Sequence, residues 1–580
     1  MNNASAIQNS LVSLNGSGAL AFGTGLGTFT VAGLSGNGNF TLADTGSNPV
    51  ALQIGNNNTG STFAGALSGA GSVTKIGTAQ VILSGANTFT GGLTVSTGSV
   101  SLQNGSALGT SGAGATVASG ANLDIGNNII LANVPITITG SGITNGGAIS
   151  NSSGTGARIG PNNVGFASGS SGPSRIIPGT TIKLGGDATI NNSSGGYLSI
   201  NANVIPVSSA AGTTTLTLRG SKDTGTGGGQ GSNLTDSGLN TSNAINGTIS
   251  DNGSNSVAVV KTDAGSWIIS DPTNRYTGGT TINAGTLNAV NGFNTALSGN
   301  ITPLGTGPIN LNGGNLNLYS SIDASIKWGP GIGYTINVQN SPSMFIQRAQ
   351  SFTGQGTSNS TNYIGNLNMG GASPATLSFN NSNDGFVVKV SGATTLLNNA
   401  TFNMLGTLGS QGFAALSLSG NLTDGAGSYS LTKTGATPFG YDYTGNATFD
   451  GGTSITAGAI AWLPGAPRAT PAASPFQFGT GTITLNGAGA AFGLQDSTAV
   501  ANPTTSTIPN YYINNPFSIG ASGGIVNVGG TKNSSSVTNN AYIAQYRRAP
   551  QNSHHTHYCR NRLNGIDLCN ITLAFRPTFR

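Results

Sequence analysis

The residues of this chain that could do chemistry are few, and almost all of them are aspartates. Before residue 547 the chain contains no His, no Cys and no Glu. This excludes His-based triads, thiol nucleophiles and most metal sites there, because catalysis needs titratable groups that converge. The best candidate group is Asp251, Asp263 and Asp271, near Lys261 and Arg275. Polysaccharide lyases and hydrolases cluster Asp with Lys or Arg in this way.

Further aspartates are scattered along the chain. Asp bonds the backbone at tight corners, so turn and corner roles are the favoured interpretation of all these aspartates, including the group above. We therefore expect no catalytic, cofactor-binding or metal-binding residue, and no cofactor. The scattered residues are Asp124, Asp187, Asp223, Asp236 and Asp323.

The segment 547–580 differs abruptly from the rest of the chain in its residue usage. It contains every His and Cys of the protein: His554, His555, His557, Cys559 and Cys569. Four of them could form a small metal site, although their spacing matches no standard zinc pattern; these four are His555, His557, Cys559 and Cys569. We expect a non-native terminus here, such as an out-of-frame extension.

Two further motifs for binding are weak. The run NNSNDG at Asn380–Gly385 faintly resembles a calcium loop, but its twelfth position is Ser391, where such a loop needs Glu. No Gly-Lys-Ser/Thr motif is present, which excludes a Walker A phosphate loop. We expect neither calcium nor nucleotide binding.

Lysines and aromatic residues recur in a fixed relation to a repeated phrase. The lysines could bind anionic polymers, but solvated caps at strand ends are the favoured interpretation. The aromatic residues could be sugar platforms, but we expect them to pack against the adjacent coil. The lysines are Lys75, Lys261 and Lys433, and the aromatic residues are Phe89, Tyr276 and Phe449.

The phrase itself occurs three times: NTFTGGLTVSTGSV from Asn87, NRYTGGTTINAGTL from Asn274 and TFDGGTSITAGAI from Thr448. Paired glycines align the copies, a β-branched residue follows three positions later, and another Gly follows that. The aligned positions are Gly92, Val95 and Gly98; Gly279, Ile282 and Gly285; and Gly452, Ile455 and Gly458.

The elements that would position these residues are short strands. The chain has 94 Gly and only 6% charged residues, and Ser, Thr, Asn and Gly favour strands and turns over helices. Apolar residues make up 36% and alternate with polar ones, which argues for order over disorder. Closely spaced strands without helical patterns indicate a solenoid or an all-β sandwich, and spaced copies of one unit favour the solenoid.

The low charge has a physical reason in such a fold. In a parallel β-helix the coils are stacked about 4.8 Å apart, so equivalent side chains form columns. Like charges in a column would repel, whereas Thr, Ser, Asn and Val would not, and Asn can form amide ladders. The net charge of +5 arises within residues 547–580, and the other 546 residues have 14 Lys and Arg against 14 Asp. The charge is therefore no argument for nucleic acid.

The run from Lys75 through NTFTGGLTVSTGSVSL to ALGT resembles the passenger-associated transport repeat, also called the autotransporter-associated β-strand repeat. The second copy matches equally well, and the third has its Asn shifted by one, at Asn446. The resemblance implies an all-β, right-handed parallel β-helix with irregular loops, in the passenger region of a bacterial surface or secreted protein.

We therefore expect a structural or adhesive passenger that presents loops from a β-helix stalk, with a carbohydrate-active enzyme as the alternative. Host or matrix glycans or proteins are the expected partners, without nucleic acid and without membrane insertion by this chain. The start MNNASAIQNS has no apolar stretch of the kind seen in a signal peptide, so we expect a fragment that lacks an export signal and a C-terminal barrel or anchor.

The expected organisation follows the three copies. Irregular coils with a flexible loop at Gly225–Gly238 separate the first two units. The expected segments are N-terminal coils at 1–67, repeat units at 68–127, 257–318 and 427–494, degenerate coils at 128–256 and 319–426, terminal coils at 495–546, and the atypical tail at 547–580.

Overall fold

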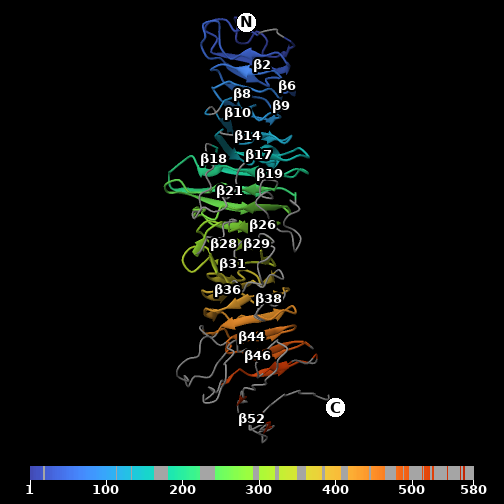
Figure 1. Cartoon of the computed structure of the whole chain (residues 1–580), viewed down its shortest axis with the longest axis vertical. Helices are drawn as coiled ribbons and strands as arrows, with labels where there is room; N and C mark the ends of the chain where they lie inside the picture. Colours follow the sequence, from blue (N-terminus) through green and yellow to red (C-terminus); the bar gives the residue numbers. More distant parts are fainter. Residues whose placement is uncertain are drawn as a thin grey trace.

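The computed structural model is a tall column of short strands, along which the sequence runs in order from the N-terminus (Figure 1). The structure describes residues 1–16, 20–110, 112, 114–131, 134–161, 180–222, 242–291, 299–320, 325–348, 361–381, 386–406, 416–442, 446–463, 478–487, 489–494, 512–513, 515–520, 522, 525–527, 545–546, 562–563 and 566–567. These residues contain no α-helix and a single 3-10 turn, η1 (Ile143–Asn145). No helix among them is long and apolar enough to cross a bilayer.

The strands form three parallel ladders. The chain passes the ladders in the order first, second, third, although some coils have no strand in one of them. The first ladder contains β2 (Thr28–Val31), β5 (Ala51–Ile54), β8 (Val73–Lys75), β10 (Leu93–Val95), β12 (Ala115–Val117), β15 (Ile136–Gly140), the start of β18 (Thr181–Asn191), β20 (Asn203–Pro206), β27 (Gly299–Ile301), β30 (Ile326–Trp328), β33 (Thr361–Ile364), β36 (Val387–Val390), β39 (Leu416–Leu418), β42 (Phe439–Asp442), β44 (Ala459–Leu463), β46 (Ala491–Leu494) and β49 (Ile525–Asn527).

The second ladder contains β1 (Leu11–Leu14), β3 (Gly33–Gly36), β6 (Ser61–Phe63), β9 (Gln80–Leu83), β11 (Ser99–Leu102), β13 (Asn122–Ile125), β16 (Ile149–Ser150), the end of β18, β21 (Gly212–Arg219), β23 (Asn255–Lys261), β25 (Thr280–Ile282), β28 (Ile309–Leu311), β31 (Ile336–Val338), β34 (Leu367–Met369), β37 (Thr394–Leu396) and β40 (Leu422–Thr423).

The third ladder contains β14 (Ile130–Leu131), β17 (Ala157–Ile159), β19 (Leu198–Ile200), β22 (Ala244–Ile245), β24 (Ser266–Ile269), β26 (Thr286–Val290), β29 (Asn315–Ser320), β32 (Ser343–Arg348), β35 (Ala375–Asn381), β38 (Ala400–Met404), β41 (Leu431–Thr434), β43 (Thr453–Ile455), β45 (Ile483–Leu485) and β48 (Phe517–Ile519). The pairs β4 (Phe40–Thr41) with β7 (Leu67–Ser68), β47 (Tyr512–Ile513) with β50 (Gln545–Tyr546), and β51 (Arg562–Leu563) with β52 (Ile566–Asp567) stand apart.

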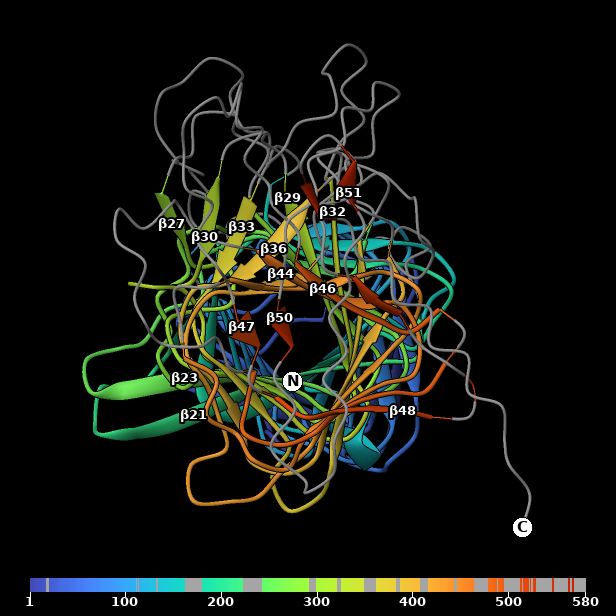
Figure 2. The same cartoon turned by 90° about the horizontal axis from the view of Figure 1, so that it is seen from below.

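The two halves of the first ladder are joined by backbone that is not strand. Ile249 bridges to Val204 of β20, and the amide of Arg275 donates to the carbonyl of Ile249. The amide of Thr302, next to β27, donates in turn to the carbonyl of Pro272. The column therefore keeps three sides along its length, as the view along the axis shows (Figure 2).

Alternation of side chains builds the core. In β8, Val73 and Lys75 point inward and Thr74 points outward, and most short strands repeat this pattern. The inward positions are filled by Val, Ile, Leu and Phe that are almost wholly buried. Full burial of one such side chain contributes about 1.5–3 kcal/mol. A continuous apolar core therefore runs through the stack.

Most outward positions are uncharged, as expected, with exceptions such as Lys183, Lys327 and Lys389. Asparagine forms a ladder in one of the neutral columns. The Nδ2 of Asn337 donates to the Oδ1 of Asn310 at 2.7 Å, and the Nδ2 of Asn368 donates to the Oδ1 of Asn337 at 2.7 Å. These residues are register partners on β28, β31 and β34. The parallel β-helix and the amide ladder are confirmed, and the sandwich is excluded. The right-handed sense and the bounds of the eight segments stay predictions.

The three copies of the repeated phrase occupy different ladders. In the first copy the lysine strand is β8 of the first ladder, followed by β9 of the second. In the second copy these roles fall to β23 and β24, in the second and third ladders. In the third copy they fall to β41 and β42, in the third and first ladders. Each copy is therefore advanced around the column by one ladder.

Candidate functional site: the lysine corner of the repeat

The lysine of each copy lies inside the column, although its chemical type suggested exposure to solvent. Lys75, Lys261 and Lys433 expose at most 1% of their surface. Each belongs to an inward column of aliphatic residues; Lys75, for example, lies between Ile54 and Val95 in register. The prediction of solvated caps is wrong, because the alternation of the strand turns the side chain inward. Binding of an anionic polymer by these lysines is excluded by the same burial.

Three backbone carbonyl oxygens hold the ammonium group of Lys75. Its Nζ donates to Ile76 at 2.7 Å, to Gly77 at 2.6 Å and to Thr97 at 3.2 Å. The first two carbonyls belong to the corner after β8, and the third belongs to the corner after β10 in the next coil. The side chain therefore ties two successive coils together.

The other two copies repeat this geometry, which we call the lysine corner. In both, the first two acceptors directly follow the lysine, and the third lies one coil further on. Lys261 donates to the carbonyls of Thr262, of Asp263 at 2.7 Å and of Ala284 at 3.2 Å. Lys433 donates to the carbonyls of Thr434 at 2.6 Å, Gly435 at 2.7 Å and Ala457 at 3.1 Å.

The final glycine of the phrase makes room for the ammonium group. A Cβ atom added at Gly98 would lie 2.7 Å from the Nζ of Lys75, closer than real Cβ contacts come. Gly98 also has a φ of 71°, in the left-handed region that favours glycine. The equivalent distances are 2.7 Å at Gly285 and 2.9 Å at Gly458. Lysine and glycine are therefore two parts of one corner.

The lysines of the corners stay mostly protonated at neutral pH, although burial disfavours their charge. Burial lowers the pKa of all three lysines from 10.5 to about 8, and at Lys261 the nearby charge of Asp263 partly opposes this. An ammonium group has three N–H donors for three carbonyl acceptors, whereas a neutral amine would turn a lone pair towards an oxygen. Among the described residues, no backbone amide donates to the carbonyls of Gly77, Asp263 or Gly435.

A buried asparagine, which the sequence analysis did not single out, serves as a rung between coils. The Oδ1 of Asn87 accepts from the amide of Leu67 at 2.9 Å, and its Nδ2 donates to the carbonyl of Ala107 at 2.7 Å. Asn274 does the same between Ile249 and Pro303. The shared position of this Asn, two residues before the aromatic residue, was the signal that could have found it.

In the third copy the backbone makes the connection between coils that the Asn side chain makes in the other two. Ala447 stands where the other copies have the buried Asn, and it forms backbone bridges to Leu422 and to Phe478. Asn446, one residue earlier, is exposed. The shifted Asn therefore does not replace the rung, because the backbone itself provides it.

The aromatic residue of the phrase is core, as expected. Phe89, Tyr276 and Phe449 are fully buried. The hydroxyl of Tyr276 lies 2.7 Å from the Oγ1 of Thr280, and Phe449 packs edge-on against Phe478 with ring centroids 5.5 Å apart. Packing against the adjacent coil is confirmed, and the burial excludes a role as sugar platforms.

The aspartates of the enzyme alternative each hold their own corner. Asp251 accepts from the amide of Val257 at 2.7 Å and from the hydroxyl of Thr277 at 2.8 Å. Asp271 accepts from the hydroxyls of Thr248 and Thr273, both at 2.7 Å. No group of three His, Cys, Asp or Glu that could hold a metal ion occurs among the described residues. The bonding pattern is that of corner residues.

Asp263 stands where the other copies have glycine, at the second position after the lysine. Its φ is 60°, a conformation that Asp tolerates better than most residues. Its carboxylate pairs with Arg219, with 3.1 Å between Oδ2 and Nε, and accepts from the amide of Gly220 at 3.2 Å. Burial raises the pKa of Asp263, but the bonds from Arg219 and Gly220 outweigh it, and the net shift is downward. Arg275 is exposed at the column surface.

Two of the scattered aspartates are also structural. Asp124 is buried and accepts from the hydroxyls of Ser101, Ser150 and Ser152. Asp187 accepts from the amide of Thr215 at 2.7 Å, beside β21. Neither makes an ion pair within the described part of the chain.

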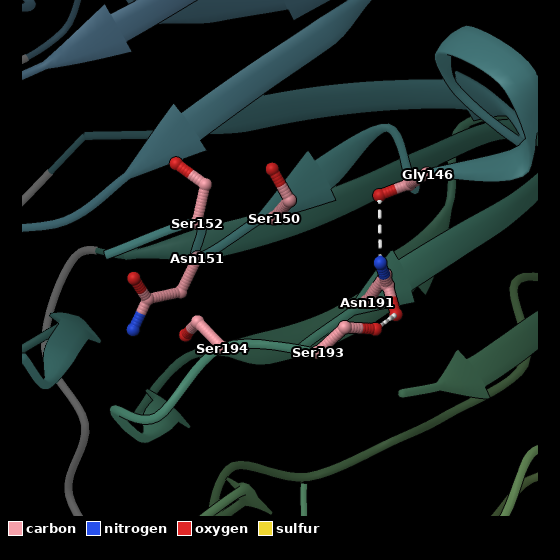
Figure 3. Close-up of a pocket in the computed structure, with 7 residues that line it drawn as sticks. All are labelled: Gly146, Ser150, Asn151, Ser152, Asn191, Ser193 and Ser194. Atoms are coloured by element: carbon pink, nitrogen blue, oxygen red, sulfur yellow. Dashed lines mark hydrogen bonds between the residues drawn. The ribbon is translucent and has the colours of Figure 1, made fainter. Parts of the chain in front are cut away.

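An open depression of about 290 Å³ lies near these residues, between the coil of Ser150 and that of Asn191 (Figure 3). Its polar side chains are bonded to their own surroundings. The Nδ2 of Asn191 donates to the carbonyl of Gly146 at 3.0 Å, and its Oδ1 accepts from Ser193 at 3.1 Å. Ser152 donates to Asp124. The walls are therefore internally satisfied and carry no charge.

Several of the candidate residues predicted from the sequence lie outside the described residues. These are Asp223, Asp236 and Asp323, the loop at Gly225–Gly238, most of the run Asn380–Gly385, and the His and Cys residues His554, His555, His557, Cys559 and Cys569.

Comparison with known families gives one match. Residues 73–102 and 259–289 match the family described as the passenger-associated-transport-repeat. These stretches contain the lysine corners of Lys75 and Lys261. No curated protein and no solved structure matched the chain. The matched repeat indicates a passenger-type domain of the autotransporter kind, which implies a secreted or cell-surface protein.

Proposed function

We propose, from the passenger-associated transport repeats that this chain carries, that it is a non-enzymatic stalk displayed at or released from a bacterial surface. The stalk holds surface features at a distance from the cell and contacts matrix or host molecules with them. Association with an outer membrane and an adhesive role belong to this proposal.

The observation that carries the proposal is the continuity of the stack. Coil follows coil along the stack, with the first and second ladders present from the N-terminal coils and the third ladder from β14 onward. A solenoid of this kind is stabilised by contacts between neighbouring coils, so it can be long without a large globular core. Such a shape suits extension and display.

The use of its charged groups supports the same proposal. Three buried lysines tie coils together, and Asp251, Asp263 and Asp271 hold separate corners. Each carboxylate that the enzyme alternative would need has a structural task in the described coils.

The proposal can be tested on intact bacterial cells that produce the protein. An antibody against residues 68–127 should label unpermeabilised cells or the culture medium, and external protease should remove the cell-bound signal. A signal confined to the cell interior would contradict it. Purified protein should leave acidic polysaccharides intact with or without calcium, and depolymerisation abolished by Asp263→Ala would favour the enzyme.

A further inference from the structure

A column of small hydroxyl side chains runs down the outer side of the third ladder. The strands that carry it are the consecutive rungs β35, β38, β41, β43, β45 and β48, in the lower part of the molecule where Figure 1 labels β38. Each of these residues is the direct register partner of the next. We call them the hydroxyl column, which consists of Thr376, Thr401, Thr432, Ser454, Thr484 and Ser518.

The hydroxyl column faces solvent. Its neighbours along each strand are inward residues of the core, so the alternation turns the hydroxyl residue outward. Ser518 is exposed, and the other members are half-buried. Among the described residues, none of these hydroxyls takes part in a side-chain hydrogen bond. Their donors and acceptors are therefore available to a ligand outside the protein.

A second column of small polar residues runs beside it, two positions further along each strand. Asn403 joins it into a ladder, because its Nδ2 donates to the Oγ of Ser378 at 3.1 Å and its Oδ1 accepts from the Oγ1 of Thr434 at 3.1 Å. Thr456 and Asn486 continue this column, and their backbone amides donate to carbonyls of the preceding coil. The two columns together form a two-dimensional array of hydroxyl and amide groups.

The array carries no charge. The only charged side chain in its strands is Lys433, which points inward and is buried. Asp424 and Asp450 belong to the corner that precedes the array, where the carboxylate of Asp424 accepts from the amides of Tyr429 and Asp450. A ligand of this face must therefore be recognised by neutral hydrogen bonds and by shape.

Other outward columns of the described structure differ from this one. In the second ladder, the asparagines at the centre of the column bond one another. In the first ladder, a run of threonines ends after four rungs at Lys183, and the column beside it contains Ile76 and Ala118. We call this run the short column, which consists of Thr74, Thr94, Thr116 and Thr137.

The spacings of the array have a chemical meaning. Neighbouring rungs are about 4.8 Å apart, and alternate residues of one strand are about 6.6 Å apart. Water molecules held by the hydroxyl and amide groups would repeat at these intervals in two perpendicular directions. The prism face of ice repeats its oxygen atoms at similar intervals. Over its six rungs the array extends about 24 Å, so it can match many lattice positions at once.

We propose that the hydroxyl column and the ladder beside it form an ice-binding face. The hydroxyls exchange hydrogen bonds with the outermost water layer of the crystal. The threonine methyl groups lie between these water molecules, so the layer next to the protein is held by groups whose positions the sheet already determines. Because those groups are ordered before the crystal is met, adsorption requires little further ordering of the protein. This inference goes beyond the proposed function, since it concerns a ligand of the column itself.

The test uses the full chain and measures the fraction of protein that enters a slowly growing ice crystal. The double variant Thr432→Lys/Thr484→Lys should enter about tenfold less than the parent, because ammonium groups in the array keep hydration shells that do not fit the crystal. Thr432→Ser keeps the hydroxyl, as Ser454 does in the natural column, and should retain most of the incorporation. The parent should also slow the recrystallisation of ice in a frozen sucrose solution.

The matched control is Thr94→Lys, which places the same charge within the short column. It should enter ice as the parent does, and thermal melts should show that all variants are folded. Exclusion of the parent from ice, equal losses in Thr94→Lys, or unchanged incorporation of the double variant would each overturn the proposal. Retention of the parent on crystalline cellulose without entry into ice would assign the face to a neutral polysaccharide and overturn it as well.

The outcome is separable from that of the proposed function. A chain that is displayed on cells but is excluded from ice overturns the ice-binding face alone. A chain that enters ice in solution but is confined to the cell interior overturns the display function alone.

Discussion

Gly98 lies against the ammonium group of Lys75, so that a Cβ at Gly98 would stand 2.7 Å from Nζ. The two residues belong to successive coils, and the same pairing joins Gly285 to Lys261 and Gly458 to Lys433. A motif that looks like two separate features in the sequence is thus one contact in space. We therefore expect substitution of this glycine to have a large effect on the local stability of the coil.

Gly98→Ala should reduce the local stability of the coil by about 2–4 kcal/mol, because strain in the left-handed region adds to a clash with Nζ and the neighbouring backbone. Gly120→Ala is the matched control. Gly120 stands at the same corner one coil on, with a φ of 80° and no atom within 4 Å of an added Cβ, so only the backbone cost of about 1 kcal/mol applies. Amide exchange of the strands β10 to β13 measures both, and equal losses would contradict the clash.

Lys261→Met should destabilise its two coils by about 1–3 kcal/mol, although it removes a buried charge. The reason is that the carbonyls of Thr262, Asp263 and Ala284 lose their donor. Lys327→Met, on the surface, should change stability by no more than about 0.5 kcal/mol. Amide exchange of β23 to β26 gives the comparison, and an increase in protection in Lys261→Met would show that the charge outweighs the bonds.

The pH dependence follows from the lowered pKa of the three lysines, about 8 in the folded chain against 10.5 for the ordinary group. Between these values the unfolded chain holds more protons than the folded one, so the free energy of unfolding should rise as the pH rises from 8 to 10.5. This stability is lost again as the pH falls through 8. A titration of isotope-labelled lysine side chains should show three groups near pH 8, and urea melts at pH 7.5 and 9.5 should show the gain.

Asn274→Ala should cost about 2–4 kcal/mol, because the amide of Ile249 and the carbonyl of Pro303 both lose their partner inside the column. Asn446→Ala, at an exposed position of the third copy, should be neutral within about 0.5 kcal/mol. Protection of residues 248–250 against amide exchange distinguishes the two. Unchanged protection in Asn274→Ala would mean that water replaces the side-chain rung.

Asp263→Asn should have only a small effect, a loss of about 0–1 kcal/mol, because its ion pair with Arg219 is about one third exposed. Asn keeps the tolerance for the left-handed backbone that this corner needs. Chemical denaturation at low and high salt measures the contribution, which should shrink with salt. A loss well above 1 kcal/mol would mean that the carboxylate has a larger task than this pair.

The fold could be predicted because its main determinants are local. Alternation of apolar and polar residues, the near absence of charge and the repeated phrase all indicate stacked short strands. The fixed position of the aromatic residue in the phrase indicates that it packs against the adjacent coil. The asparagine ladder of Asn310, Asn337 and Asn368 follows from the same stacking.

The buried lysines were missed although the sequence contained their signal. In Val73, Thr74 and Lys75 the alternation that turns Val inward also turns Lys inward. The charge of lysine suggested an exposed side chain, whereas its position in the alternation indicated a buried one. What could not be predicted is the set of acceptors. Thr97 lies one coil away, and its distance from Lys75 depends on how the intervening corner turns.

The grouping of three aspartates along the sequence does not carry over into space. Asp251, Asp263 and Asp271 are close in the sequence, but the chain between Asp251 and Asp271 runs through the second and third ladders. The three residues therefore stand at different corners of the column. Sequence distance is a poor guide in a solenoid, where neighbours are one full coil apart.

Because each copy of the phrase is advanced by one ladder, the length of the chain between two copies determines which side of the column the later copy occupies. Gaining or losing a complete turn would leave every later copy at its own azimuth, whereas gaining or losing one strand position would rotate all that follows by a third of a circle. Natural variants of different length should therefore differ by whole turns wherever the direction faced by a surface of the column matters to the organism.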